Sequence, residues 1–180
     1  DANLTSTATV KMKVVDVSDN DGPVAAQEVT IDTTPPTTTV DITSITDDTG
    51  SNTNDFITND NDGLTIGATL SAGLASDEAL MYSNDNGLTW SDITADVAGT
   101  TVTHTDANLT STNTIQMKVV DLAGNDGTVN TQLVTIDTTP PLAPTAVTIT
   151  EDTNNDGILN GTELDGNVDV QIDLPAGVEA

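Results

Sequence analysis

The chain has 180 residues, with 29 Asp and Glu against 3 Lys and Arg, so its formal net charge is −26. This charge excludes nucleic acid and anionic membrane surfaces as natural partners, since both are bound through Lys and Arg. The chain has no cysteine, which excludes disulfides and thiolate metal sites, and no apolar run reaches the roughly 20 residues of a membrane-spanning helix.

The charge leaves two possibilities: a disordered chain, or a fold in which bound cations neutralise clusters of carboxylates. Hydrophobic residues make up 35% of the chain and recur in alternating Val, Ile and Thr segments, which favours the folded alternative. Clusters of Asp, Asn, Gly and Pro separate these segments and indicate turns.

Internal repetition divides the chain. The segment DANLTST occurs at Asp1 and at Asp106, a shift of 106 − 1 = 105, and the segments MKVVD and IDTTPP recur at the same shift. With DTTPP as the joint, we predict three pieces: residues 1–36 as the C-terminal part of one repeat, 37–141 as a complete repeat, and 142–180 as the N-terminal part of another.

The complete repeat shows short alternating segments with no helical period, and these predict about seven strands. In chain order they are Thr38–Ile45, Leu64–Leu70, Ala79–Ser83, Leu88–Ile93, Thr100–Thr105, Thr114–Asp121 and Thr128–Ile136. The simplest arrangement is an all-β fold, an antiparallel sandwich of two sheets repeated about every 105 residues, which is the size of an immunoglobulin domain. The predicted core residues are Leu64, Ile66, Leu70, Leu80, Tyr82, Trp90, Val102, Ile115, Met117, Val119, Leu133 and Ile136.

A calcium-binding pattern lies in the third piece, in the segment EDTNNDGILNGTEL at 151–164. Its polar residues have the ligand spacing of a twelve-residue calcium loop, with Gly at the sixth position and Glu at the twelfth. The predicted direct ligands are Asp152, Asn154, Asp156 and Glu163, with Ile158 binding through its carbonyl and Asn160 through water. Magnesium is disfavoured because it takes few carboxylates, and zinc because the chain has no Cys and one His.

The loop between the first two strands of the complete repeat occupies the same place. Asp55, Ile57, Asn59 and Asp62 match residues of the later loop at a shift of 101. Because strands alternate in direction, this loop and the joint after the repeat are expected at one end of the sandwich. The predicted ligands there are Asp47, Asp48, Asp55, Asp60 and Asp62, together with Asp137 of the joint; at the preceding joint they are Asp32, Asp77, Asp121 and Asn125.

The segment KVVDLAGNDGTVNTQLVTIDTTPP, Lys118–Pro141, with the acidic loops, resembles the immunoglobulin-like tandem repeats of large bacterial surface adhesins of the repeats-in-toxin and biofilm-associated kind. The resemblance implies a secreted, cell-surface protein whose repeats are extender modules. It further implies that several Ca²⁺ ions at the loops and joints stiffen a stalk that projects a distal adhesive domain in cell adhesion and biofilm formation. The partners it implies are the adjacent repeats of the same chain.

Other function classes remain as alternatives. A filament or surface-layer subunit, with lateral protein neighbours, needs the same rigid sandwiches, and a glycan-binding or ice-binding module could use exposed Thr residues. The segment Ser83-x-Asp85-x-Gly87-x-x-Trp90 matches the Asp-box hairpin of sialidase-type propellers, but we interpret it as a structural hairpin with a buried Trp90. His104 has no Ser or Cys partner in the pattern, so we expect a structural histidine and no enzymatic activity.

Overall fold

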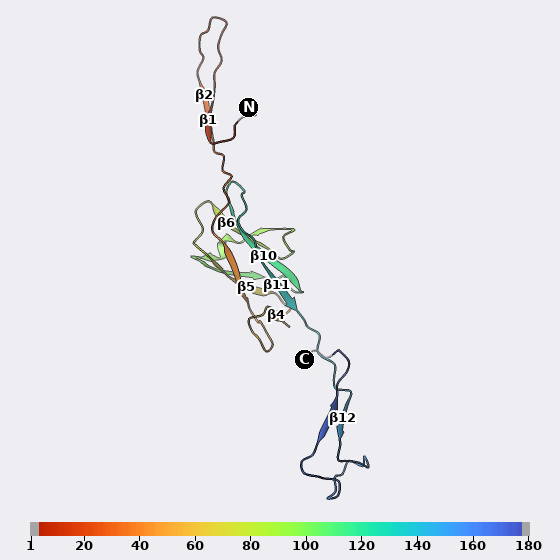
Figure 1. The fold of residues 1–180 in the computed structure, drawn as a ribbon. Coiled ribbons are helices and arrows are strands. Elements are labelled where there is room, and N and C mark those ends of the chain that lie inside the picture. The colour runs from red at the N-terminus through yellow and green to blue at the C-terminus, as the bar shows by residue number, and fades with distance from the viewer. Residues whose placement is uncertain (1–3, 178–180) are drawn as a thin grey trace. The chain divides into compact units, whose positions relative to one another are not determined.

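The computed structural model describes residues 4–177, and nearly all of its regular structure is β-strand (Figure 1). The all-β prediction is therefore confirmed. Two compact units make up the chain, Asp1–Thr138 and Thr139–Ala180. Three residues of the first DANLTST segment and the last three of the predicted third piece lie outside the described residues. No helix in the described part of the chain is long and apolar enough to cross a membrane.

Strands joined by turns and loops make up both units. In the first unit they are β1 (Ala8–Met12), β2 (Ala25–Val29), β3 (Val40–Ile45), β4 (Ile57–Thr58), β5 (Leu64–Leu70), β6 (Glu78–Ser83), β7 (Ser91–Asp92), β8 (Val97–Ala98), β9 (Thr101–Asp106), β10 (Asn113–Asp121) and β11 (Asn130–Ile136). A single 3-10 turn, η1 (Thr94–Asp96), precedes β8. The second unit contains the hairpin of β12 (Ala146–Ile149) and β13 (Val170–Asp173).

Strands β3 to β11 form a sandwich of two sheets. One sheet has the order β3-β5-β9-β8 and the other β4-β11-β10-β6-β7. All pairs are antiparallel except β4 with β11, where Ile57 and Thr58 lie parallel to Thr135 and Ile136. At the bulge in β3, the Ser44 hydroxyl occupies the space beside Gly67 that a Cβ would need, so any larger residue there would displace this hydroxyl.

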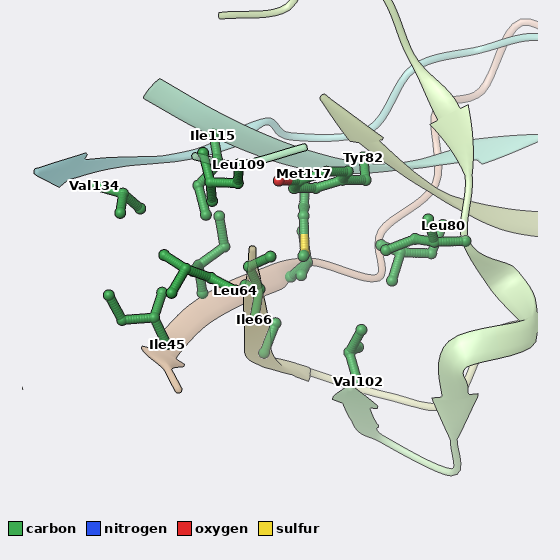
Figure 2. Close-up of a cluster of buried hydrophobic side chains, with 14 of the residues drawn as sticks. Ile45, Leu64, Ile66, Leu80, Tyr82, Val102, Leu109, Ile115, Met117 and Val134 are labelled. Atoms are coloured by element: carbon green, nitrogen blue, oxygen red, sulfur yellow. The ribbon is translucent and has the colours of Figure 1, made fainter. Parts of the chain in front are cut away.

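Alternation along the strands builds the core between the sheets. In β5 and β10 every second residue is buried, and Figure 2 shows side chains such as Ile66 and Met117 meeting in one cluster. Complete burial of one such aliphatic side chain contributes about 1.5–3 kcal/mol to folding. Nine of the predicted core residues are buried: Leu64, Ile66, Leu70, Leu80, Tyr82, Val102, Ile115, Met117 and Val119.

Two core predictions are wrong. Leu133 is 54% exposed and the next residue, Val134, is fully buried in its place. Trp90 is only half-buried: it lies just before β7, and its Nε1 donates to the Gly87 carbonyl of the preceding turn at 3.1 Å. Its ring lies on the outside of the second sheet, with the Lys118 ammonium 4.3 Å from the ring centre, a cation–π contact. Ile136 is partly buried against the core.

The β1–β2 hairpin has the same pairing of residues as the β10–β11 hairpin. Ala8 pairs with Val29 as Asn113 pairs with Val134, which is the shift of 105 in both strands. The Lys13–Asp21 ion pair at 2.6 Å corresponds to the Lys118–Asp126 ion pair at 2.8 Å. The structure thus shows that the repeated sequence adopts the same local geometry twice, while the division into three repeat pieces stays a prediction.

Candidate metal sites in the acidic loops

The loop at 152–163 is organised by its own side chains. Asp152 accepts hydrogen bonds from the backbone N–H groups of Asp156, at 3.1 Å, and Gly157, at 2.8 Å. Asn154 Oδ1 accepts from Asp156 N at 2.9 Å, and Asp156 Oδ1 accepts from Ile158 N at 2.8 Å. At the C-terminal end of the loop, Glu163 Oε2 accepts from the Asn160 backbone N–H at 3.2 Å. Three predicted ligands, Asp152, Asn154 and Asp156, therefore share one hydrogen-bonded turn. Asn160 and Glu163 share a second turn, and the side chain of the sixth predicted ligand, Ile158, is exposed.

The loop after β3 has the same design. Asp55 Oδ1 accepts from Ile57 N at 3.1 Å, as Asp156 does from Ile158. Asp48 Oδ2 accepts from Phe56 N at 3.1 Å, which places Asp48 in the role of Asp152. The backbone conformations agree too: Phe56 has φ 63° and Gly157 has φ 76°. A left-handed conformation is costly for Phe, so the surrounding bonds must hold it.

One carboxylate oxygen of Asp48 is buried and lacks a hydrogen-bond partner within the described residues. This oxygen, Oδ1, is the only buried side-chain oxygen or nitrogen in residues 4–177 that has no hydrogen-bond partner. A buried carboxylate oxygen without a donor or cation is destabilising by a few kcal/mol. A positive ion at this position would remove that cost.

Carboxylates also crowd the C-terminal end of the same loop. The nearby charge of Asp60 is the main cause that raises the pKa of Asp62 above its ordinary value, with a smaller contribution from Asp47. Asp62 N donates to Asp60 Oδ1 at 3.1 Å, which fixes the two residues side by side. Because the folded-state pKa is raised, this repulsion disfavours the folded loop increasingly as pH rises through that pKa, and it is fully present at neutral pH.

The donor set fits calcium and not a softer metal. All predicted ligands offer carboxylate, amide or carbonyl oxygens, which Ca²⁺ takes six to eight at a time. Within residues 4–177, however, no three Asp, Glu, His or Cys side chains are placed so that they alone could hold an ion. Asn side chains and backbone carbonyls would have to complete the shell. The carboxylates that already accept backbone N–H bonds keep a second lone pair on each oxygen for this purpose.

Thr58 of β4 connects this loop to the joint after the sandwich. Its hydroxyl donates to the Asp47 carbonyl and accepts from Asp60 N at 3.0 Å. Its own carbonyl accepts from the Asp137 backbone N–H at 2.9 Å. Thr58 is 2% exposed, so these bonds are shielded from water. The acidic loop and the first residue of the DTTPP joint are therefore fastened to the same short strand.

The preceding joint is assembled differently. Asp121 Oδ1 accepts from Asn125 N and Asp121 Oδ2 from Asn125 Nδ2, both at 2.8 Å, and Asn125 Nδ2 also donates to the Asp32 carbonyl at 3.2 Å. The side-chain bond from Asn125 is the main cause that lowers the pKa of Asp121. Asp77 is exposed and forms no hydrogen bond with this group in the described structure. Three of the four predicted ligands meet, in an Asx-type turn that explains their presence without a metal.

The first partial repeat forms the same turn despite its different sequence. Asp16 accepts from Asn20 N at 2.9 Å and from Asn20 Nδ2 at 2.9 Å. Asp19 has φ 61° at the position where the second copy has Gly124 with φ 88°. Asp is among the residues that tolerate this conformation best after Gly, so the loss of the glycine leaves the turn intact.

Asp60→Asn is expected to change thermal stability in opposite directions with and without calcium. In EGTA at neutral pH the substitution raises the unfolding midpoint, because it removes the repulsion on Asp62 while Asn still accepts the Asp62 N–H. In calcium it lowers the midpoint, because a ligand charge is lost. Asp19→Asn, which removes one exposed charge at a left-handed position, is the matched control and should respond equally in both buffers. Thermal unfolding followed by circular dichroism measures the midpoints. If Asp60→Asn shifts the midpoint in the same direction in both buffers, Asp60 is not a calcium ligand.

The sequence patterns did not single out Asp106, which is 7% exposed and binds three groups inside the sandwich. Its signal is the alternation of β9, where Val102, His104 and Asp106 share the inward parity, so a charged residue was due to face the core. His104 has a partner after all: its Nδ1 lies 2.7 Å from Asp96 Oδ2.

Comparison with known proteins adds no assignment. A scan against protein-family models gives no match to this chain. A search of curated proteins likewise finds none that is similar. Any functional assignment therefore depends on the fold and on the geometry of the acidic loops.

Proposed function

We propose that this chain is a calcium-stiffened extender segment of a large extracellular bacterial surface protein of the adhesin kind. The all-β sandwich, the 105-residue recurrence of the same hairpin geometry and the charge of −26 support this proposal. A stalk module needs no catalytic site. It needs a stable domain and a joint whose stiffness is controlled.

The observation that carries the proposal is the position of Thr58. Calcium bound by the carboxylates around Asp48 and Asp60 would order the loop, and the loop holds Thr58 through the Asp47 carbonyl and the Asp60 N–H. Thr58 in turn holds Asp137, the residue that opens the DTTPP joint. Pro140 and Pro141 then restrict the backbone further by fixing φ. Calcium binding would thus be transmitted to the joint through one buried residue.

Spin-label distances test this mechanism. The chain has no cysteine, so Thr103→Cys and Thr148→Cys place two labels on exposed positions of the two units without competing sites. The proposal predicts a narrow distribution of label-to-label distances in calcium and a broad one in EGTA. Thr58→Val, which keeps the side-chain shape but removes the hydroxyl, should broaden the distribution even in calcium.

The control pair is Thr103→Cys with Thr131→Cys, both in the first unit, and its distribution should be the same in both buffers. Equal widths for the two-unit pair in calcium and EGTA would mean that calcium does not act on the joint. The stalk proposal would then lose its mechanism even if calcium binds.

A further inference from the structure

A polar cavity of about 350 Å³ opens between the two sheets, where β6 and β9 end and β7 begins. Its volume lies within the range of small-molecule sites. The chain's single Tyr and single His both line it, Tyr82 from one sheet and His104 from the other, with their ring centres 4.6 Å apart. The two acidic loops contribute none of its lining residues.

The floor of the cavity is a buried carboxylate. Asp106 Oδ2 accepts from the Tyr82 hydroxyl at 3.0 Å and from Asn84 Nδ2 at 2.7 Å, and Asp106 Oδ1 accepts from the Asn108 backbone N–H at 2.8 Å. All three donors are neutral, so no ion pair compensates the burial. Oδ1 has one bond and therefore retains a lone pair that a ligand hydroxyl can use.

Other lining groups have hydrogen-bonding capacity to spare. The Ser91 hydroxyl and the Asn108 side-chain amide form no hydrogen bond within the described residues, and Asn84 uses only its NH₂ group, so its carbonyl oxygen remains available. His104 Nδ1 is engaged by Asp96, which leaves Nε2. The cavity therefore offers donors and acceptors side by side.

The donors and acceptors that line the cavity indicate which class of ligand it can bind. Anions are disfavoured by Asp106, by Asp96 beside His104 and by the net charge of −26. An ammonium group only donates, so it could bond Asp106 but would make no use of the Asn108 amide N–H groups, which are exposed and bond water. Neighbouring hydroxyl groups of a sugar both donate and accept, and can bond a carboxylate and an amide at the same time.

We propose that this cavity binds one neutral sugar residue of a glycan, with Asp106 and Asn108 holding adjacent hydroxyls and Ser91 adding a third contact. The proposal is independent of calcium and of the stalk mechanism. It gives the repeat a binding activity of its own along its length, in addition to any spacing role.

Nuclear magnetic resonance tests it with two unambiguous reporters, because the chain has one Tyr and one His. The probes are the methyl glycosides of mannose, galactose, glucose and N-acetylglucosamine, each titrated into the whole chain at constant pH, in calcium and in EGTA. At least one glycoside should shift the ring signals of Tyr82 and His104 in a saturable way, in both buffers. Methylammonium chloride and sodium phosphate are the counter-probes and should not.

Asn108→Ala and Ser91→Ala should each weaken binding of that glycoside about fivefold, the loss of one hydrogen bond, at an unchanged unfolding midpoint. The backbone bond of residue 108 to Asp106 survives the first change, so the floor stays in place. Thr103→Ala, on the same strand as His104 but outside the cavity, is the control. No saturable shift with any glycoside, a stronger response to methylammonium, or unchanged affinity in both variants would overturn the proposal.

Discussion

Calcium is expected to raise the unfolding midpoint of the first unit by on the order of 10 °C, and Asp48→Asn to remove most of that increase. A ligand that binds only the folded state at 100 times its dissociation constant stabilises it by about 2.7 kcal/mol. For a domain of this size each kcal/mol corresponds to several degrees. Asp48 is the sensitive position because its buried Oδ1 has no other partner.

In EGTA, the same substitution should be close to neutral or stabilising, since it removes the charge of a half-buried carboxylate and keeps an oxygen for the Phe56 N–H. Melting curves of wild type, Asp48→Asn and the surface control Asp19→Asn, each in calcium and in EGTA, give the comparison. An equal calcium response in wild type and Asp48→Asn would place any bound ion elsewhere.

Met117→Ala is expected to lower the free energy of unfolding of the first unit by about 2–5 kcal/mol, the usual cost of truncating a buried Met. Met117 is completely buried between the sheets (Figure 2). The repeat provides a matched control, because Met12 occupies the same position of the MKVVD segment and is 72% exposed. Met12→Ala should change the unfolding free energy by less than about 0.5 kcal/mol.

Urea denaturation of the 180-residue chain, followed through the single Trp, measures both values. Similar losses for the two substitutions would mean that the β1–β2 hairpin packs its apolar face in solution. A small loss for Met117→Ala would mean that the sandwich core is not assembled as described.

Strands in which apolar and polar residues alternate could be predicted from the sequence. Strands whose position depends on a single hydrogen bond could not. The strand Leu64–Leu70 was predicted with its observed bounds, because seven residues of period two leave no other register. β4 has only two residues and pairs in parallel, and its place depends on Thr58, which no periodicity reveals. The error at Leu133 has a different origin, because alternation itself argues against it: Leu133 and Ile136 have opposite parity in one strand, so both could not face the core.

For the acidic loops, too, the sequence predicted some features and not others. The spacing of acidic residues located both loops, and the hydrogen bonds of Asp48 and Asp152 show that they are built alike despite different lengths. The sequence could not indicate which carboxylate oxygen would be left without a partner, since that depends on how Phe56 turns the loop. Nor could it place Asp96 beside His104, because a two-residue strand and a turn separate them.

Anomalous diffraction from crystals grown in calcium tests most directly whether the acidic loops are metal sites. Difference maps should show one strong peak bound by Asp48 together with amide and carbonyl oxygens of its loop, and another inside the loop from Asp152 to Glu163. Replacing calcium with EGTA should abolish both peaks. Well-ordered loops in ample calcium, with no peak and with these carboxylates bound only to water, would contradict the account.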